Sequence, residues 1–256
     1  NFKNFMCAHP IPSVSRGDFP AVPLLAIGFL TLGTCFSQTL YDFGNPSAEE
    51  QLYIEFINRA RANPAAEGAR LAATTDPAVL FNYTYHGVNL TMMQSEFSAL
   101  PALPPLAPNA KLMATSRSHS AWMLASGIQS HDQPTNTFWD RISDAGYDAY
   151  TGGENIFAYS INPWHGHAGF EVDWGSGGTG GMQAGRGHRA NIHSSDFNEI
   201  GVGVVFGINS SVTPAIGPQL VTQDFGTQFD ELKFGTGVAY YDLNANNFYD
   251  LGEGIS

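Results

Sequence analysis

The sequence predicts an α+β domain in which helices come first and a pair of strands comes last. Two segments, residues 47–63 and 110–127, carry apolar residues at helical spacing. The pattern changes from residue 200, because the segments 200–208 and 219–229 are rich in valine and aromatic residues, which favours paired strands. With 256 residues, 43% of them hydrophobic, the chain is long enough for one substantial core.

The first helix is expected to begin directly after Ser47. Ser47 and Glu50 have the spacing of a capping box, which satisfies the first free amides of a helix. Apolar residues between positions 52 and 60 recur every four residues and form one stripe. Pro64 should end or kink this helix, because the residue before a proline is disfavoured in helical conformation.

The middle of the chain alternates extended and helical segments. The proline-rich segment 100–111 cannot be helical, and Asn109 is then expected to cap the second long helix. A short helix is expected at residues 138–146. Nine glycines lie within residues 166–187, which indicates a long, flexible and functional loop. The histidines within or beside it, His165, His167 and His193, are expected to be loop residues.

Residues 1–37 resemble an export leader. Basic residues precede an apolar run at positions 21–38, which is too short to span a bilayer but suits a signal sequence. A buried N-terminal helix is the alternative. Both cysteines, Cys7 and Cys35, lie in this leader, so the mature chain would contain no disulfide. We therefore expect a secreted or cell-surface protein without a membrane span after leader removal.

The charge of the chain argues against nucleic acid as a partner. It carries 11 basic and 23 acidic residues, for a net charge of −12, and a polyanion would be repelled. The acidic residues are dispersed, which favours a role in solubility.

Six segments, in this order, resemble the bacterial secreted form of the CAP superfamily, also called the SCP/PR-1 family. They read FINRARANP, LMATSRSHSAWMLASGIQSH, GGENIFA, GHRANI, EIGVGVV and VTQDFG, and the resemblance spans roughly residues 47–228. The resemblance implies a three-layer α-β-α sandwich with a central antiparallel sheet and a cleft over it. We assign this domain to residues 38–232.

In that family the cleft holds two histidines and two acids, and it often binds a divalent cation. Mapped onto this chain, the resemblance gives His131, Glu154 and His188. The second acid has two candidates, Glu171 and Asp173, because the glycine-rich segment in which they lie blurs the match to the family; the spacing to His188 favours Glu171. Asp173 is then expected to contact the ligand.

Imidazoles and carboxylates from distant segments can bind zinc or magnesium with positions left for water. Without a metal, a histidine bonded to a glutamate could move protons. No nucleophile is evident, because the serines at positions 116, 118 and 120 lie on a helix and not on a strained turn. Asn155 is a second candidate for ligand contact, although its residue type favours a role in holding the scaffold together through hydrogen bonds.

Each candidate also has a structural interpretation. His131 could simply end a helix, and Glu154 could be a charge partner at a helix start. His188 with Arg189 could be a solvated pair in a loop. The second acid could be an ordinary surface carboxylate.

The C-terminal segment 235–256 carries a separate signal. Counted from Asp242, six residues occupy positions 1, 3, 5, 7, 9 and 12 of an EF-hand calcium loop. These are Asp242, Asn244, Asn246, Phe248, Asp250 and Glu253. Asn247 replaces the usual glycine at position 6. Residues 235–241 look like a strand, so the segment resembles the truncated start of an SdrD B-like repeat; a metal-free turn rich in Asp and Asn is the alternative.

These observations favour a secreted, non-catalytic binding module whose cleft takes a divalent metal ion or a small extracellular ligand, such as a lipid, a peptide or a cell-wall component. A metal-dependent hydrolase acting on peptides or cell walls is the competing hypothesis, with metal-activated water and Glu154 as the base. A structural part of a larger surface adhesin is the third. The family's functions are diverse, so the fold alone does not decide among them.

Overall fold

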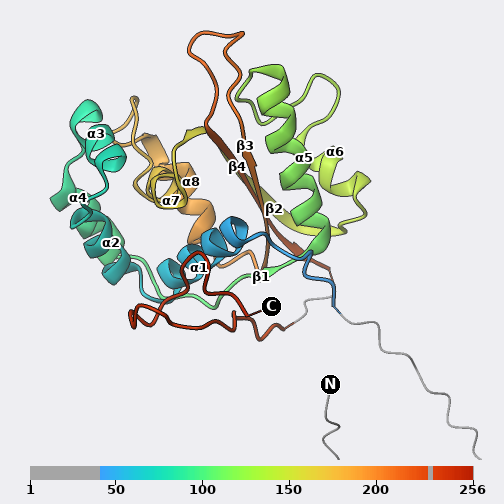
Figure 1. Cartoon of the computed structure of the whole chain (residues 1–256), viewed down its shortest axis with the longest axis horizontal. Coiled ribbons are helices and arrows are strands. Elements are labelled where there is room, and N and C mark those ends of the chain that lie inside the picture. Colours follow the sequence, from blue (N-terminus) through green and yellow to red (C-terminus); the bar gives the residue numbers. More distant parts are fainter. Residues whose placement is uncertain (1–40, 230–232, 256) are drawn as a thin grey trace, which may run out of the picture. The chain divides into compact units, whose positions relative to one another are not determined.

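The computed structural model describes residues 41–229 and 233–255, and the predicted leader lies outside this part of the chain. A four-stranded sheet with the strand order β1-β3-β4-β2 forms the central layer (Figure 1). Its strands are β1 (Ala107–Pro108), β2 (Ala149–Ser160), β3 (Glu199–Phe206) and β4 (Gln219–Gln228). The three long strands are antiparallel, as expected. β1, a two-residue piece of the proline-rich connection, pairs in parallel with β3, so the sheet is mixed.

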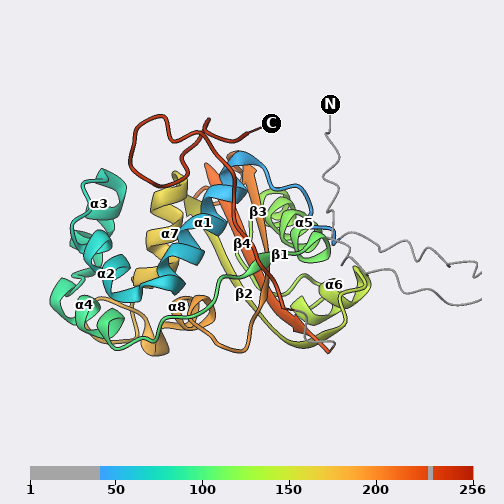
Figure 2. The ribbon, with the colours of Figure 1, turned by 90° about the horizontal axis from the view of Figure 1, so that it is seen from below.

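Helices cover both faces of the sheet, which confirms the three-layer sandwich (Figure 2). On one face lie α5 (Ala110–Ser126) and α6 (Phe138–Asp144); on the other lie α1 (Ala48–Ala62), α7 (Pro163–Val172) and α8 (Gly187–Ile192). The main core fills the space between α1, α7 and the sheet, with Tyr53, Phe170 and Phe225 among its buried side chains. Within the described residues, no helix is both long and apolar enough to cross a bilayer.

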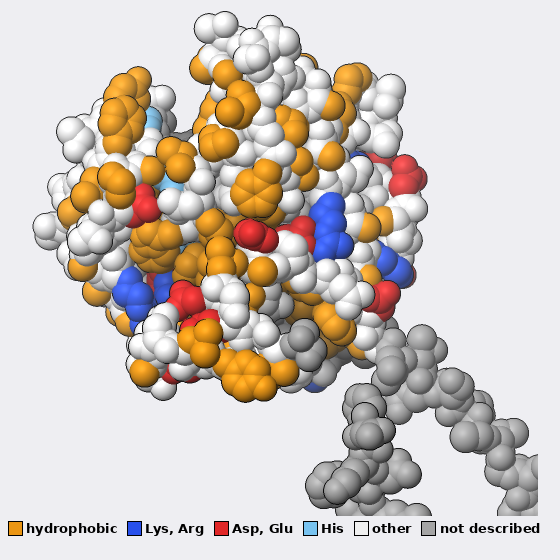
Figure 3. Space-filling view, in the orientation of Figure 1, with side chains coloured by type: hydrophobic (Ala, Val, Ile, Leu, Met, Phe, Trp, Pro, Cys, Tyr) orange, Lys and Arg blue, Asp and Glu red, His pale blue; other side chains and the backbone are white. Residues whose placement is uncertain are grey.

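Three further helices form a lobe beside α1 and α7 that the sequence did not predict in full. They are α2 (Pro64–Ala72), α3 (Pro77–His86) and α4 (Leu90–Ser98). Their buried side chains form a second core with Val172 and Trp174. Figure 3 shows hydrophobic side chains exposed on the surface of this lobe.

The predicted helix starts are confirmed by their caps. Ser47 and Glu50 form the complete capping box of α1, with distances of 3.2 Å and 2.8 Å in its two hydrogen bonds. The Asn109 side chain accepts hydrogen bonds from the first amides of α5. Pro64 ends α1 as expected, but it also begins α2, because its missing N–H is tolerated at the first helical position.

Glycines in β3 allow α5 to lie directly on the sheet. A Cβ atom at Gly203 would lie 2.2 Å from the backbone of Ser116, and one at Gly201 would lie 2.0 Å from that of Leu112. In the resulting close contact, Ser116 donates to the carbonyl of Gly201 at 3.1 Å, and Ser120 donates to that of Gly203 at 2.8 Å. Two of the three serines near His119 therefore serve packing.

The glycine-rich segment is not one long loop. Its first third belongs to α7, and His165 and His167 are buried on that helix. The glycines there serve close packing, since a Cβ at Gly166 would lie 1.9 Å from the hydroxyl of Tyr53 on α1. His193, also expected in a loop, is buried beside α8.

The C-terminal segment packs against the domain. Residues 235–241 do not form the expected strand; the part of the segment that the structure describes makes one isolated bridge, between Tyr240 and Gly254. Tyr249 is buried in a cluster with Leu52 and Phe56 of α1. The ring of Phe248 stacks on that of Phe56, with a centroid distance of 5.4 Å.

Candidate functional site

A pocket of about 360 Å³ opens beside β2, the last strand of the sheet. Glu154 and Asn155 both line it, and successive strand residues point to opposite faces, so the pocket lies at the strand's free edge. The complete lining is His131, Glu154, Asn155, Asp173, Gln183, Ala184, Gly187, His188 and Asn191. The structure therefore brings together His131, Glu154, His188 and Asp173.

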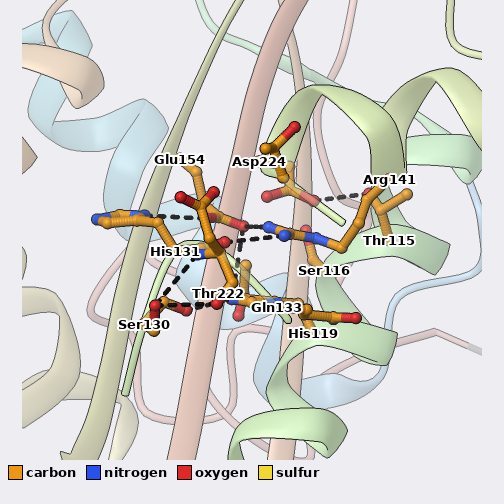
Figure 4. Close-up of polar contacts among 12 residues, drawn as sticks. Thr115, Ser116, His119, Ser130, His131, Gln133, Arg141, Glu154, Thr222 and Asp224 are labelled. Carbon is orange, nitrogen blue, oxygen red and sulfur yellow. Dashed lines mark hydrogen bonds and ion pairs between the residues drawn. The ribbon is translucent and has the colours of Figure 1, made fainter. Parts of the chain in front are cut away.

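The first half of the site is built around Glu154, whose side chain is only 2% exposed. His131 Nδ1 donates to Glu154 Oε1 at 2.9 Å, and Arg141 Nη2 donates to Oε2 (Figure 4). Arg141, on α6, also donates through Nη1 to the backbone carbonyl of His131 at 2.8 Å. One guanidinium thus fixes both members of the histidine–carboxylate pair. Glu154 lies within β2 and His131 lies beyond the end of α5, so neither is the helix-end residue of the structural interpretation.

Hydrogen bonds of His119 hold the loop that carries His131 in position. His119 Nε2 donates to the carbonyl of Ser130 at 2.9 Å, and His119 Nδ1 accepts from the amide of Gln133 at 3.2 Å. Burial lowers the pKa of His119 and outweighs the charge of Glu154, whose Oε2 lies 3.9 Å away. Both ring nitrogens therefore have partners when the imidazole is neutral.

Glu154 faces a second acid, Asp224, across the sheet on β4. Burial opposes ionisation of Glu154, but the hydrogen bond from His131 and the charge of Arg141 lower its pKa. Burial and the charge of Glu154 together raise the pKa of Asp224 well above its usual value. Asp224 accepts a hydrogen bond of 2.6 Å from the Thr115 hydroxyl (Figure 4). The pair consists of an acid at the pocket whose pKa is lowered and a buried acid behind it whose pKa is raised.

The second half of the site joins His188 and Asp173. Asp173 ends α7 in the left-handed conformation, with φ of 56°. Its carboxylate accepts from His188 Nδ1 at 2.7 Å, from the His188 backbone amide at 3.1 Å and from Gln183 Nε2 at 2.8 Å. Both histidines that line the pocket are therefore bonded to a carboxylate through Nδ1. His188 lies on α8 rather than in a loop.

Glu171 does not join the pocket, in contrast to the expectation from its spacing. Its side chain is fully buried and accepts from His193 Nε2 at 3.1 Å. Side chains two residues apart on a helix point in directions that differ by about 200°. Glu171 therefore points into the protein, whereas Asp173, just past the helix end, reaches the pocket. Arg189, the expected solvated partner of His188, is instead buried and bonded to the carbonyl of Glu171.

Asn155 is buried and holds the scaffold together beneath the pocket. It donates to the carbonyl of His188 at 3.1 Å, and its own side-chain oxygen accepts from Asn191 at 2.9 Å. The sequence did not identify Arg141, Gln183 or Asn191 as site residues. No local sequence pattern marks these three residues, because each contacts segments that are distant in the chain.

The predicted calcium residues also come together. Asp242 accepts from the backbone amides of Asn246 and Asn247, each at 3.0 Å. The amides of Asn244 and Asn246 each donate to Asp250 Oδ2 at 2.7 Å. Glu253, buried, accepts from the backbone amides of residues 243 and 250. Asn247 adopts φ of 59° at position 6, where a left-handed residue is needed.

Over residues 41–229 and 233–255, no group of three or more His, Cys, Asp and Glu side chains is arranged to hold a metal ion by itself. At the pocket, two imidazoles are available as nitrogen ligands, and the two carboxylates are already bonded to them. In the C-terminal loop, asparagine and backbone oxygens would have to complete the ligand set.

The chain is similar to one protein family and to two solved structures of bacterial proteins. The family model described as "CAP: Cysteine-rich secretory protein family" matches residues 54–225. An extracellular protein containing an SCP domain from Bacillus anthracis is 23% identical, with a TM-score of 0.38, and the match covers 60% of this chain and 45% of that protein. An outer surface protein from Borrelia burgdorferi is 13% identical, with a TM-score of 0.38 and coverage of 60% and 96%.

This chain therefore matches less than half of the length of the Bacillus anthracis protein. No curated protein matches the chain. Because the family model covers well over half of its residues, the chain belongs to the cysteine-rich secretory protein (CAP) family.

Proposed function

We propose that this protein is an extracellular binding module whose pocket holds a divalent metal ion through Nε2 of His131 and Nε2 of His188. The observation that carries the proposal is that each imidazole is bonded to a carboxylate through Nδ1, at 2.9 Å and 2.7 Å. An Nδ1–H donated to a carboxylate fixes the tautomer that leaves Nε2 free for a metal. Glu154 and Asp173 then orient the ligands instead of binding the metal.

This donor set fits zinc better than magnesium. Zinc accepts imidazole nitrogen, whereas magnesium prefers oxygen ligands in a strict octahedral geometry. Two protein ligands would leave positions for water or for a group of an extracellular ligand, and the bound metal would polarise that group as a Lewis acid.

The surroundings of Glu154 favour binding over catalysis. A metal-dependent hydrolase would need a base that accepts a proton from water. Both oxygens of Glu154 are engaged by His131 and Arg141, and these contacts help to lower its pKa, which makes it a weak base. Ser116 and Ser120, the buried serines near the site, donate to backbone carbonyls and are not available as nucleophiles.

Calorimetric titration with zinc tests the proposal. We expect one zinc ion per chain, with an affinity at least about tenfold lower in His131→Ala and in His188→Ala. His86→Ala is the matched control, because it removes an imidazole from α3, outside the pocket. Zinc binding that survives in the double variant His131→Ala/His188→Ala would overturn the assignment of the metal ligands.

A second measurement separates the binding module from the hydrolase. Purified protein is incubated with pools of peptides and of peptidoglycan, with and without a chelator. We expect no turnover in either condition. Turnover that the chelator abolishes and zinc restores would identify a metal-dependent hydrolase instead.

For the C-terminal loop we propose weak calcium binding by residues 242–253, in the millimolar range of extracellular modules. The spacing of its oxygen-bearing side chains supports this, as does the left-handed Asn247 at the position that an EF-hand usually fills with glycine. Because Phe248 stacks on Phe56, calcium binding would stiffen a segment that is already docked on α1.

A further inference from the structure

We propose a second binding site, separate from the pocket at β2, that takes an uncharged apolar small molecule. It is a pocket of about 410 Å³ between α3 and the segment in which β2 leads into α7. Its lining residues are Ala78, Phe81, Asn82, His86, Phe157, Tyr159, Ile161, His165 and Trp174, and none of them also lines the histidine pocket. The volume lies within the range of small-molecule sites.

Aromatic side chains form the walls of this pocket from both sides. Phe81 contributes from α3, and Phe157 and Tyr159 contribute from β2. Trp174 lies deeper, being only 8% exposed. Such walls bind a ligand by apolar contact and ring packing rather than by hydrogen bonds.

The pocket carries no charge at neutral pH. No lysine, arginine, aspartate or glutamate is among its described lining residues. His165, on its inner side, is 2% exposed, and burial lowers its pKa to about 4, so the imidazole is neutral. Burial also lowers the pKa of His86. A charged ligand would lose its hydration without gaining a counter-charge.

The polar groups of His165 and the Asn82 amide bond to each other and to the backbone. His165 Nδ1 accepts from the backbone amide of Ile161 at 3.2 Å, and its Nε2 lies 2.9 Å from the amide of Asn82. That amide also donates to the carbonyl of Ala78 at 2.9 Å. Apart from these groups the lining is mainly aromatic and aliphatic, which favours an apolar ligand.

The mouth of the pocket is accessible and apolar. Phe81 is 65% exposed and Ile161 is 55% exposed. Tyr85, one turn further along α3 and stacked on Phe81 at 5.9 Å, is 73% exposed but does not line the pocket. Phe81 and Tyr85 belong to α3, and Figure 3 shows hydrophobic side chains on the surface of the lobe that contains this helix.

The test uses the neutral fluorophore N-phenyl-1-naphthylamine, whose emission rises in an apolar site. We expect saturable binding with one site per chain, weakened about tenfold or more in Phe81→Asp. Tyr85→Asp is the matched control, because it adds the same charge to the same exposed helix outside the pocket, and it should bind as the unmodified protein does. Circular dichroism of both variants should be unchanged, since each side chain is mostly exposed.

Competition defines the ligand class. We expect n-octanol to displace the fluorophore and octanoate to be about tenfold weaker, because only the latter must desolvate a charge. His131→Ala/His188→Ala should retain full fluorophore binding, which separates this site from the proposed metal site. No saturable binding, equal loss in Phe81→Asp and Tyr85→Asp, or equal competition by octanoate would each overturn the proposal.

Discussion

Replacing Glu154 with glutamine tests how the first half of the site is held together. The change removes one charge and nearly no volume. In the protein, Glu154 Oε2 accepts from Arg141, and Oε1 accepts from His131. The side chains of Glu154 and Arg141 are 2% and 6% exposed, so solvent screens this ion pair little.

The magnitude follows from what remains after the change. Removing one partner of a buried ion pair costs about 3–5 kcal/mol, because the other charge stays buried without compensation. A glutamine oxygen can still accept one hydrogen bond, and Arg141 retains the carbonyl of His131 at 2.8 Å. We therefore expect the lower end of the range, a loss of about 3 kcal/mol in the free energy of unfolding at pH 7.

The pH dependence has a defined sign. The pKa of Glu154 is lower in the folded than in the unfolded protein, so its contribution to stability is present above the unfolded pKa of 4.5 and disappears as the pH falls through the folded pKa. The difference between Glu154→Gln and the unmodified protein should therefore be largest near neutral pH and shrink in acid. Urea unfolding followed by tryptophan fluorescence at a series of pH values measures it.

Asp132→Asn is the control, since it removes an exposed carboxylate next to His131. It should change the unfolding free energy by less than about 0.5 kcal/mol at any pH. A Glu154→Gln loss below about 1 kcal/mol at pH 7, or a loss of the same size at pH 3, would refute a buried ion pair at this position.

Further predictions concern the rest of the molecule. Gly203→Ala should lower the unfolding free energy by about 2 kcal/mol or more, because its Cβ would lie 2.2 Å from the α5 backbone, whereas Gly187→Ala, with nothing within 4 Å, should be neutral in the same urea titration. As the pH falls from about 6.5 to about 4, His165 binds a proton in the unfolded protein but not in the folded one, where it is buried. The free energy of unfolding should therefore fall by up to about 1.4 kcal/mol per pH unit in this range, and His165→Gln should make this decrease smaller. Terbium luminescence sensitised by the tyrosines of the C-terminal segment should saturate and be displaced by calcium. Glu253→Gln should weaken terbium binding, and Asp196→Asn, which removes an exposed acid outside residues 242–253, should leave it unchanged.

Local chemistry made much of the fold predictable. The capping residues Ser47 and Asn109 mark the starts of α1 and α5, and the segments rich in valine and aromatic residues identify β3 and β4. The helices α3 and α4 were missed, and α7 was taken as loop. Glycine normally disfavours helices. Gly166 is nevertheless required in α7, because a larger residue there would collide with the Tyr53 hydroxyl of α1. The sequence alone does not reveal this contact between two helices.

The site was predictable only through the family resemblance, and only in part. His131, Glu154 and His188 were assigned from their motifs and do line one pocket. The choice between Glu171 and Asp173 could not be made from spacing. It depends on where α7 ends and on the left-handed turn at Asp173, both of which tertiary packing determines.

The two histidine–carboxylate pairs are attached to opposite layers of the sandwich. His131 and Glu154 are held from the α6 side, whereas Asp173 and His188 belong to α7 and α8. The distance between the two imidazoles therefore depends on how the hydrophobic core separates these layers. A substitution that enlarges a core side chain should increase this distance, and one that shortens a core side chain should decrease it, while each histidine–carboxylate pair stays intact. We therefore expect apolar core residues that contact neither histidine to alter the selectivity of the proposed metal site.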